Sequence, residues 1–163
     1  MATQAKPMGD VARPALLSDV NELCAMMADD YKESGYPYYH EASVAAFRRL
    51  ILDPALGRIW LLERDGLVAG YVVLAFCFSI EYGGRDAYVD DLYVRKPFRR
   101  SGLARLGLET LIDDCRRRSV RAISLEVEPK NVGAKRLYAK TGFGHNRRQL
   151  MTLRLLEVKK DSS

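Results

Sequence analysis

Apolar positions early in the chain recur at the spacing of α-helices. The first such segment has apolar residues three and four positions apart, at Val20, Leu23, Cys24 and Met27. Ser18 precedes them and is a residue type that caps helix N-termini. The segment 42–52 repeats the pattern, and Asp53-Pro54 ends it because the residue before a proline avoids the helical conformation. We therefore expect two helices, with a short strand at 11–13 before them.

Three apolar runs in the middle of the chain have the composition of β-strands. Residues 59–63 and 67–78 are rich in apolar and aromatic side chains, and the Asp65-Gly66 pair between them is typical of a hairpin turn. A third run, 87–94, follows a glycine-rich turn and ends before Pro97. This pattern predicts an antiparallel hairpin followed by a central strand.

Helical and strand patterns alternate in the second half of the chain. The predicted elements are a long amphipathic helix at 102–118, a buried strand at 123–127, a helix at 132–140 and a final strand at 151–158. The alternation predicts one α/β (α+β) domain over residues 11–158. The polar, aperiodic ends, 1–10 and 159–163, are expected to be flexible.

Charge is unevenly distributed along a chain whose composition is otherwise that of a globular protein. The 163 residues carry a net charge of +5, but the segment from Arg95 to Arg148 holds 15 Lys and Arg against 5 Asp and Glu. A basic half suits a polyanionic small ligand, and the acidic remainder suits a cationic one. Ordinary solvated faces would produce the same distribution.

The cysteines and histidines indicate no metal site. Cys24, Cys77 and Cys115 lack metal-ligand spacing, and we interpret them as buried thiols of a reducing compartment. His40 and His145 join no nucleophilic or metal-binding group of residues, so neither is assigned a role. No secretion signal opens the sequence, and no apolar stretch reaches the roughly 18 residues of a membrane span. A cytoplasmic protein that does not cross a membrane is expected.

A basic turn between the third predicted strand and the long helix carries the most chemical information. Its sequence is Arg99-Arg100-Ser101-Gly102-Leu103-Ala104. The first turn of a helix has unpaired backbone NH groups and the positive end of the helix dipole. Small residues there let phosphate oxygens approach the NH groups closely. In isolation, the same residues more often form an ordinary basic helix start.

A second segment changes the meaning of this turn. It begins 27 residues after Ala104 and contains Asn131, Tyr138 and the pair Gly142-Phe143. Together the two segments resemble the GNAT acetyltransferase superfamily: the first is similar to its R/Q-x-x-G-x-G/A motif, and the second to the motif with an Asn, a Tyr and a Gly-Phe ending. Within the superfamily, the layout is most similar to the diamine (spermidine/spermine) acetyltransferases.

The resemblance implies a fold and a cofactor. The fold would be a mixed, mostly antiparallel sheet of six to seven strands with about four helices, and a cofactor cleft would lie where the fourth and fifth strands splay. Acetyl-CoA would bind with its acetyl carbonyl and pantetheine against the backbone of Leu92, Tyr93 and Val94 and near Asn131. The residues implied to surround its pyrophosphate are Arg99, Arg100, Ser101, Gly102, Leu103, Ala104 and Arg105.

Two side chains are the candidates for proton transfer. Tyr138 is similar in position to the family tyrosine that protonates the departing thiolate, and a phenol with a pKa of about 10 can donate at neutral pH. An amine must lose a proton before it attacks, and Asp90 is the first choice to accept it. Asp91 is expected to point to the opposite face unless a β-bulge alters the alternation. Aromatic packing for Tyr138, a salt-bridged Asp90, or proton removal through water are the alternatives.

The loop after the first helix is the candidate acceptor site. Its acids and aromatics suit a cationic amine through charge and cation-π contact, although a polar loop with aromatic anchors would have a similar composition. The substrate-binding candidates are Asp29, Asp30, Tyr31, Tyr36 and, from a later turn, Glu81.

Three classes of function remain open from the sequence. The leading one is direct, metal-free transfer of an acetyl group to a primary amine of a small amine, a polyamine or a lysine-type acceptor; protein lysine or N-terminal amines are the alternative acceptors. A noncatalytic acyl-CoA-binding domain is the second class. Nucleic-acid binding through the cluster Arg116-Arg117-Arg118 is the third and is not expected, because the cluster falls at a helix C-terminus where cations favour the dipole. A homodimer is expected from the resemblance.

Overall fold

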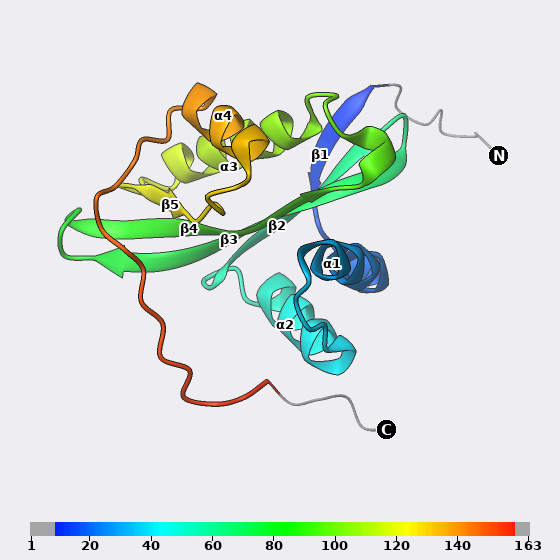
Figure 1. The fold of residues 1–163 in the computed structure, drawn as a ribbon, viewed down its shortest axis with the longest axis horizontal. Coiled ribbons are helices and arrows are strands. Elements are labelled where there is room, and N and C mark those ends of the chain that lie inside the picture. The colour runs from blue at the N-terminus through cyan, green and yellow to red at the C-terminus, as the bar shows by residue number, and fades with distance from the viewer. Residues whose placement is uncertain (1–8, 159–163) are drawn as a thin grey trace.

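One mixed sheet lies between two pairs of helices in the computed structural model, which describes residues 9–158 (Figure 1). Its elements are β1 (Asp10–Pro14), α1 (Val20–Ser34), α2 (His40–Leu52), β2 (Gly57–Arg64), β3 (Leu67–Ser79), β4 (Gly84–Val94), α3 (Leu103–Arg117), β5 (Ile123–Leu125) and α4 (Val132–Lys140). Short 3-10 turns at Leu17–Asp19 and Lys96–Phe98 precede α1 and α3. The predicted mixed α/β fold with four helices is confirmed.

The sheet has the order β1-β2-β3-β4-β5 within the described residues. The first four strands are antiparallel neighbours, whereas β5 runs parallel to β4. Only Ala87–Val89 of β4 pairs with β5, although β4 continues to Val94. The two strands therefore splay, and the remaining part of β4 has a free edge on this side.

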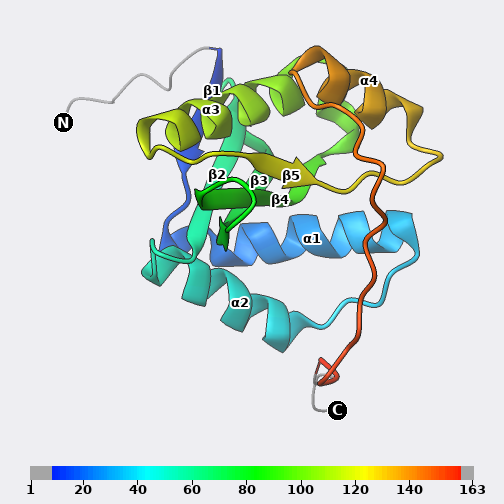
Figure 2. The same cartoon turned by 90° about the vertical axis from the view of Figure 1, so that its left-hand side faces the viewer.

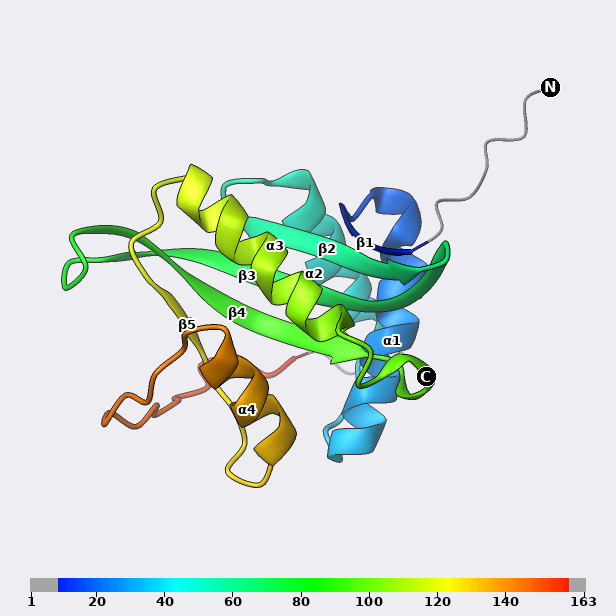
Figure 3. The same ribbon diagram turned by 90° about the horizontal axis from the view of Figure 1, so that it is seen from above.

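Helices cover the two faces of this sheet in pairs. α1 and α2 lie on one face, and α3 and α4 lie on the other (Figures 1 and 2). On the first face, α1 and α2 bury Leu23, Met26 and Phe47 against Tyr71 of β3. On the second face, α3 lies across the strands (Figure 3) and packs Leu108 and Leu111 against Trp60, Val72 and Leu74. Both cores fix the strand β4 that runs between them.

Several expectations need correction. The sheet has five strands in the described residues and not six to seven, because the predicted final strand at 151–158 pairs with no described strand. β5 ends at Leu125, two residues before the predicted end. Ser18 does not cap α1, since Ser18 lies within a 3-10 turn and Asp19 occupies the N-cap position.

The ends and the cysteines also differ in part from expectation. Asp10, placed in the flexible N-terminus, is the first residue of β1 and accepts hydrogen bonds from Arg64 at 2.7 Å. The other predicted flexible residues, apart from Gly9, lie outside the described part of the chain. Cys24 and Cys115 are buried, but Cys77 is exposed because it lies on the distal part of the β3–β4 hairpin. Among the described helices, none has the length and apolar character to span a membrane.

Candidate functional site

β4 is irregular at the point where it leaves β5. Val73 pairs with Asp91 and Leu74 pairs with Val89, so Asp90 is the extra residue of a β-bulge. A bulge breaks the alternation of side chains between the two faces of a strand. Burial, followed by the negative charges of Asp91 and Asp90, raises the pKa of Tyr31 of α1. The bulge is the exception foreseen for strict alternation, and it brings both carboxylates close to α1.

Three carboxylates with raised pKa values meet between β4 and α1. Burial raises the pKa of Asp91 to about 6; a hydrogen bond from Tyr71 opposes this rise, and the charges of Asp30 and Asp90 add to it. The Tyr71 hydroxyl donates to Asp91 Oδ2 at 2.5 Å. The pKa of Asp90, whose side chain is exposed, is raised by partial dehydration alone. Burial, followed by the charge of Glu33, raises the pKa of Asp30. We call Asp30, Asp90 and Asp91 the acid cluster.

Tyr138 reaches the cleft from α4. Its half-buried ring packs edge-on against Phe143, with the ring centroids 6.0 Å apart. Burial, followed by the negative charge of Asp91, raises the pKa of Tyr138. Its hydroxyl makes no hydrogen bond to any other described residue, so a protonated phenol is available to a ligand.

The turn before α3 exposes a run of main-chain donors. Arg100 has φ 59° and Gly102 has φ 93°, and both values lie in the left-handed region. Within the described residues, no protein atom accepts a hydrogen bond from the main-chain NH groups between Arg100 and Arg105; the next NH group, of Leu106, bonds to Gly102 O at 2.9 Å. Successive NH groups of this kind form a concave anion-binding surface, and the helix dipole strengthens it. We call residues 100–105 the amide turn.

The side chain of Arg99 is turned away from the amide turn. Its Nε donates to Val94 O at 2.8 Å, and its guanidinium binds Glu33 of α1 at 2.8 Å. The guanidinium also lies over the ring of Tyr93, 5.5 Å from its centroid. Arg99 therefore ties the C-terminal end of α1 to the end of β4, and its charge is already neutralised by a protein carboxylate.

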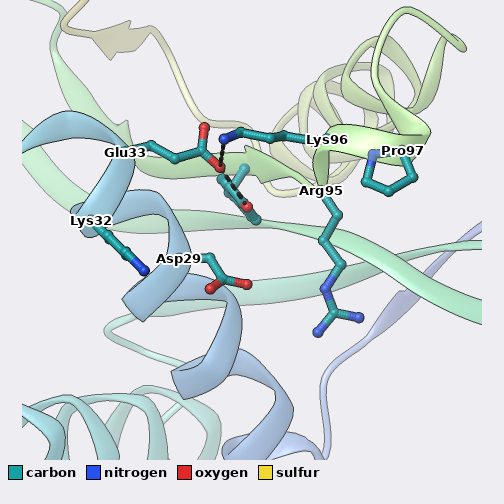
Figure 4. A pocket seen from close by; sticks show the side chains of 7 residues that line it. Asp29, Lys32, Glu33, Arg95, Lys96 and Pro97 are labelled. Carbon is teal, nitrogen blue, oxygen red and sulfur yellow. Dashed lines mark hydrogen bonds and ion pairs between the residues drawn. The ribbon is translucent and has the colours of Figure 1, made fainter.

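A cavity of about 490 Å³ opens between α1 and the end of β4 (Figure 4). Its lining consists of Asp29, Lys32, Glu33, Tyr93, Arg95, Lys96 and Pro97. In Figure 4, the ammonium group of Lys96 points to Glu33, and the two are 3.8 Å apart. Asp29 therefore belongs with this mixed-charge cavity and not with the acid cluster.

The remaining predicted site residues have different surroundings. Tyr31 lies beside the acid cluster, whereas the Tyr36 hydroxyl donates to Glu128 at 2.7 Å and joins the α1–α2 loop to the β5–α4 loop. Glu81 lies at the β3–β4 turn and binds Arg148 at 2.6 Å. Asn131 Oδ1 caps α4 by accepting from Ala134 N at 3.0 Å. Of the five acceptor candidates, Asp30 and Tyr31 are thus the ones that lie close to Asp91.

Sequence reasoning missed Tyr71 and Glu33. Tyr71 is fully buried in β3 and looks like core in the sequence, yet its hydroxyl orients Asp91. Glu33 was one acid among several in the segment predicted as the loop after the first helix; that prediction was wrong for residues 29–34, which belong to α1. Glu33 receives hydrogen bonds from both Tyr93 and Arg99. No local signal marks either residue, because each contact joins strands or helices far apart in the chain.

Comparisons with known proteins agree with this geometry. Residues 23–143 match the model of the acetyltransferase (GNAT) family. An integron cassette protein from the mobile metagenome of Cole Harbour Salt Marsh is 36% identical, with a TM-score of 0.82 over 90% of this chain and 91% of that one. A search of curated proteins gives no match.

Two more distant structures share the fold. A possible acetyltransferase from Clostridium difficile 630 is 18% identical, with a TM-score of 0.79 over 91% of this chain and 99% of that one. A predicted acetyltransferase from Clostridium acetobutylicum, described with acetyl-CoA, is 19% identical, with a TM-score of 0.74 over 88% of this chain and 96% of that one. Because the family match spans the sheet strands β2–β5 with the helices between them, the chain belongs to the acetyltransferase (GNAT) family and is a GNAT-type acetyltransferase.

Proposed function

We propose that this enzyme transfers the acetyl group of acetyl-CoA directly to a primary amine of a small amine, a polyamine or a lysine-type acceptor. The observation that carries the proposal is the amide turn, whose NH groups from Arg100 to Arg105 have no acceptor within the described protein. A diphosphate matches such a row of donors at a helix N-terminus. The neighbour from Clostridium acetobutylicum, described with acetyl-CoA, supports the same cofactor.

The free edge of β4 fits the rest of the cofactor. Past Val89, no described strand pairs with β4 on the β5 side, and Leu92 to Val94 lie along this edge. Acetyl-CoA supplies a reactive thioester and a pantetheine arm with two amide groups. The exposed main chain of β4 can hydrogen-bond those amides, and an NH group there can stabilise negative charge on the carbonyl oxygen. Along the free edge of β4, the protein therefore binds the cofactor through backbone groups.

The acid cluster fits the acceptor. A protonated amine is attracted by carboxylates, and Asp30, Asp90 and Asp91 lie together on the acceptor side of β4. The amine must then lose its proton, which calls for a base whose pKa is near neutral. Asp90 remains a candidate for this role. Asp91 is the stronger one, because Tyr71 orients it and its pKa is raised to about 6.

Tyr138 fits the opposite proton transfer. Its raised pKa keeps the phenol protonated at neutral pH, and its hydroxyl has no other partner in the described residues. The phenol can therefore donate a proton to a thiolate as it departs. In this scheme, Asp91 or Asp90 accepts the proton of the amine, and Tyr138 donates a proton to the departing thiolate. The acetyl group passes directly from the cofactor to the amine, so no covalent acetyl-enzyme is required.

An acetyl-transfer screen tests the proposal. The purified protein is assayed with acetyl-CoA against diamines and polyamines, amino acids, free lysine analogues, and peptides with lysine or N-terminal amines. Calorimetry with coenzyme A runs in parallel. Tight binding of coenzyme A together with turnover of one amine class is expected. Binding without turnover of any amine supports the noncatalytic alternative, and a folded protein without coenzyme A binding refutes the cofactor assignment.

Two variants, assayed with an amine that the enzyme acetylates, test whether Tyr138 is the general acid. Tyr138→Phe should lower maximal turnover at least about tenfold, since general acid catalysis contributes on the order of a hundredfold or more. Tyr39→Phe is the matched control: it removes a hydroxyl from another half-buried tyrosine, one whose main chain, rather than its hydroxyl, contacts Ser43. Equal turnover in both variants would show that Tyr138 is not the acid.

A further inference from the structure

A second basic surface lies at the end of α3 opposite to the amide turn. α3 runs from Leu103 to Arg117, so about 22 Å separate its two ends. The β3–β4 hairpin extends past the helices at the end where α3 finishes (Figures 1 and 3). Arginines from several elements gather at this end, where they are far from the proposed cofactor site.

Two guanidinium groups of this surface lie over one aromatic ring, that of the half-buried Phe76 in β3. The ring centroid is 4.9 Å from Cζ of Arg85 in β4 and 5.9 Å from Cζ of Arg118 after α3. Cation-π attraction holds each guanidinium against the ring, although the two like charges repel each other. An anion bound between them would offset this repulsion.

Two more arginines reach the same place. Arg58 of β2 lies opposite Leu74, which is on the same face of β3 as Phe76. The Nε atom of Arg58 is buried and has no hydrogen-bond partner within the described residues. The exposed Arg121 precedes β5, and its main-chain NH donates to Arg85 O at 2.8 Å. We call Arg58, Arg85, Arg118 and Arg121 the arginine patch.

Most of the charge of the arginine patch is not neutralised by the protein. Asp114 binds Arg118 at 2.6 Å, but no acidic side chain in the described part of the chain forms an ion pair with Arg58, Arg85 or Arg121. The helix dipole accounts for cations in the last turn of α3. It does not account for arginines that come from β2 and β4. The expectation against nucleic acid considered the helix end alone, and the patch is larger than that.

An exposed aromatic ring lies beside the arginine patch. Phe78 is directly opposite Arg85 in the β3–β4 pair, so the two side chains are neighbours on one face of the sheet. Phe78 is 76% exposed. A single exposed apolar side chain is ordinary, but here it adjoins unpaired arginines. Proteins that bind single-stranded nucleic acid combine such cations for the phosphates with aromatic rings on which bases stack.

We propose that this chain binds single-stranded nucleic acid at the arginine patch, with phosphates on Arg85, Arg118 and Arg121 and an unpaired base stacked on Phe78. Guanidinium groups match phosphate oxygens through two parallel hydrogen bonds. A duplex keeps its bases stacked on one another and leaves the ring of Phe78 unused, and an acidic peptide offers that ring no flat partner. No group of the patch is assigned to the sugar, so RNA and DNA strands should bind alike.

Fluorescence anisotropy with the full chain tests the proposal. The probes are labelled twelve-nucleotide oligo(U) and oligo(dT), a duplex of the same length and an oligoglutamate peptide. Both single strands should bind with a Kd on the order of 10 µM at low salt, and the logarithm of affinity should fall with that of salt with a slope of about −2 for three phosphates. The duplex and the peptide should bind more weakly. Absence of single-strand binding at low salt, or equal binding of the duplex or the peptide, overturns the proposal.

A double variant tests the phosphate contacts. Arg85→Gln/Arg121→Gln breaks no ion pair with a described acid, and it should weaken oligo(U) binding at least about tenfold and make the salt slope shallower. Arg48→Gln/Arg49→Gln is the matched control, because it removes the same charge from exposed positions of α2 on the other face of the sheet. Equal losses in both double variants would show attraction to net charge alone and overturn the proposal.

A second pair of variants tests the stacked base. Phe78→Ala should weaken oligo(U) binding about tenfold without changing the salt slope, since stacking is not electrostatic. Ile80→Ala is the matched control: it shortens an apolar side chain that is 92% exposed at the same hairpin, and it should bind like the unmodified protein. If Phe78→Ala also bound like the unmodified protein, no base would stack there and the proposal would be wrong. Thermal unfolding checks that each variant is folded.

Coenzyme A separates this inference from the proposed function. Because the arginine patch and the amide turn lie at opposite ends of α3, saturating coenzyme A should leave oligo(U) binding unchanged. Competition between the two would place the oligonucleotide in the cofactor site and overturn the proposal. The anisotropy assay needs no acetyl transfer, so nucleic-acid binding and acetyltransferase activity can fail independently.

Discussion

The two sides of the cleft are built from different chemistry. On the proposed cofactor side, the amide turn and the free edge of β4 present main-chain groups, and the guanidinium of the adjoining Arg99 is occupied by Val94 O and Glu33. On the acceptor side, the groups that matter are side chains, with Asp91 oriented by the buried Tyr71. Substitutions on the first side should act through backbone conformation, whereas those on the second should act through charge and proton transfer.

The largest expected effect lies on the acceptor side. Asp91→Asn keeps the size of the side chain and an acceptor for Tyr71, but it removes the base. Turnover with an active amine should fall about a hundredfold or more, while the affinity for coenzyme A measured by calorimetry stays unchanged. Asp90→Asn should cost less, because its carboxylate is exposed and no described side chain orients it as Tyr71 orients Asp91. If the affinity of Asp91→Asn for coenzyme A fell in parallel with its turnover, the two sides of the cleft would not act separately.

Asp91→Asn should also stabilise the fold. Burial raises the pKa of Asp91 to about 6, above the value of about 3.9 for an unfolded chain. Ionising this carboxylate therefore destabilises the native state as the pH rises from about 4 to 6, at about 1.4 kcal/mol per pKa unit. Asp91→Asn should unfold with a free energy about 3 kcal/mol higher at pH 8 and with no gain at pH 3.5. Urea titrations at both pH values measure the difference, and a gain that is independent of pH would contradict this origin.

The sequence predicted the main-chain features of the proposed cofactor side better than the side-chain contacts of the acceptor side. The amide turn, its glycine and its place before α3 could be predicted because a local motif determines a local backbone shape. The order of strands and helices followed from periodicity for the same reason. The bulge at Asp90 could not be predicted, because it depends on how β4 pairs with β3. The prediction of a strand at 151–158 was wrong for a related reason. Alternation of apolar and polar residues indicates a strand, but it does not indicate the neighbouring strand with which that strand would pair.

Gly102 provides a conformational test of the cofactor side. A Cβ atom at Gly102 would meet nothing within 4 Å, yet φ is 93°, so Gly102→Ala changes backbone preference without a clash. Strain of this kind costs on the order of 1–2 kcal/mol, which should lower coenzyme A affinity about tenfold. Gly83→Ala is the matched control, because Gly83 has φ 71° and equally open space but lies in the β3–β4 turn. It should reduce stability while leaving coenzyme A affinity unchanged.

The smallest expected effect is the one that most sharply tests the main-chain view of the cofactor side. Arg100→Asn removes an exposed charge from the amide turn, while asparagine tolerates the left-handed conformation at φ 59°. Exposed charges contribute up to about 1 kcal/mol and are screened by salt, so coenzyme A affinity should fall no more than about fivefold at low salt and less at high salt. Arg49→Asn, on α2, controls for the change in net charge. A loss as large as that of Gly102→Ala, and insensitive to salt, would show that a side chain and not the backbone holds the cofactor.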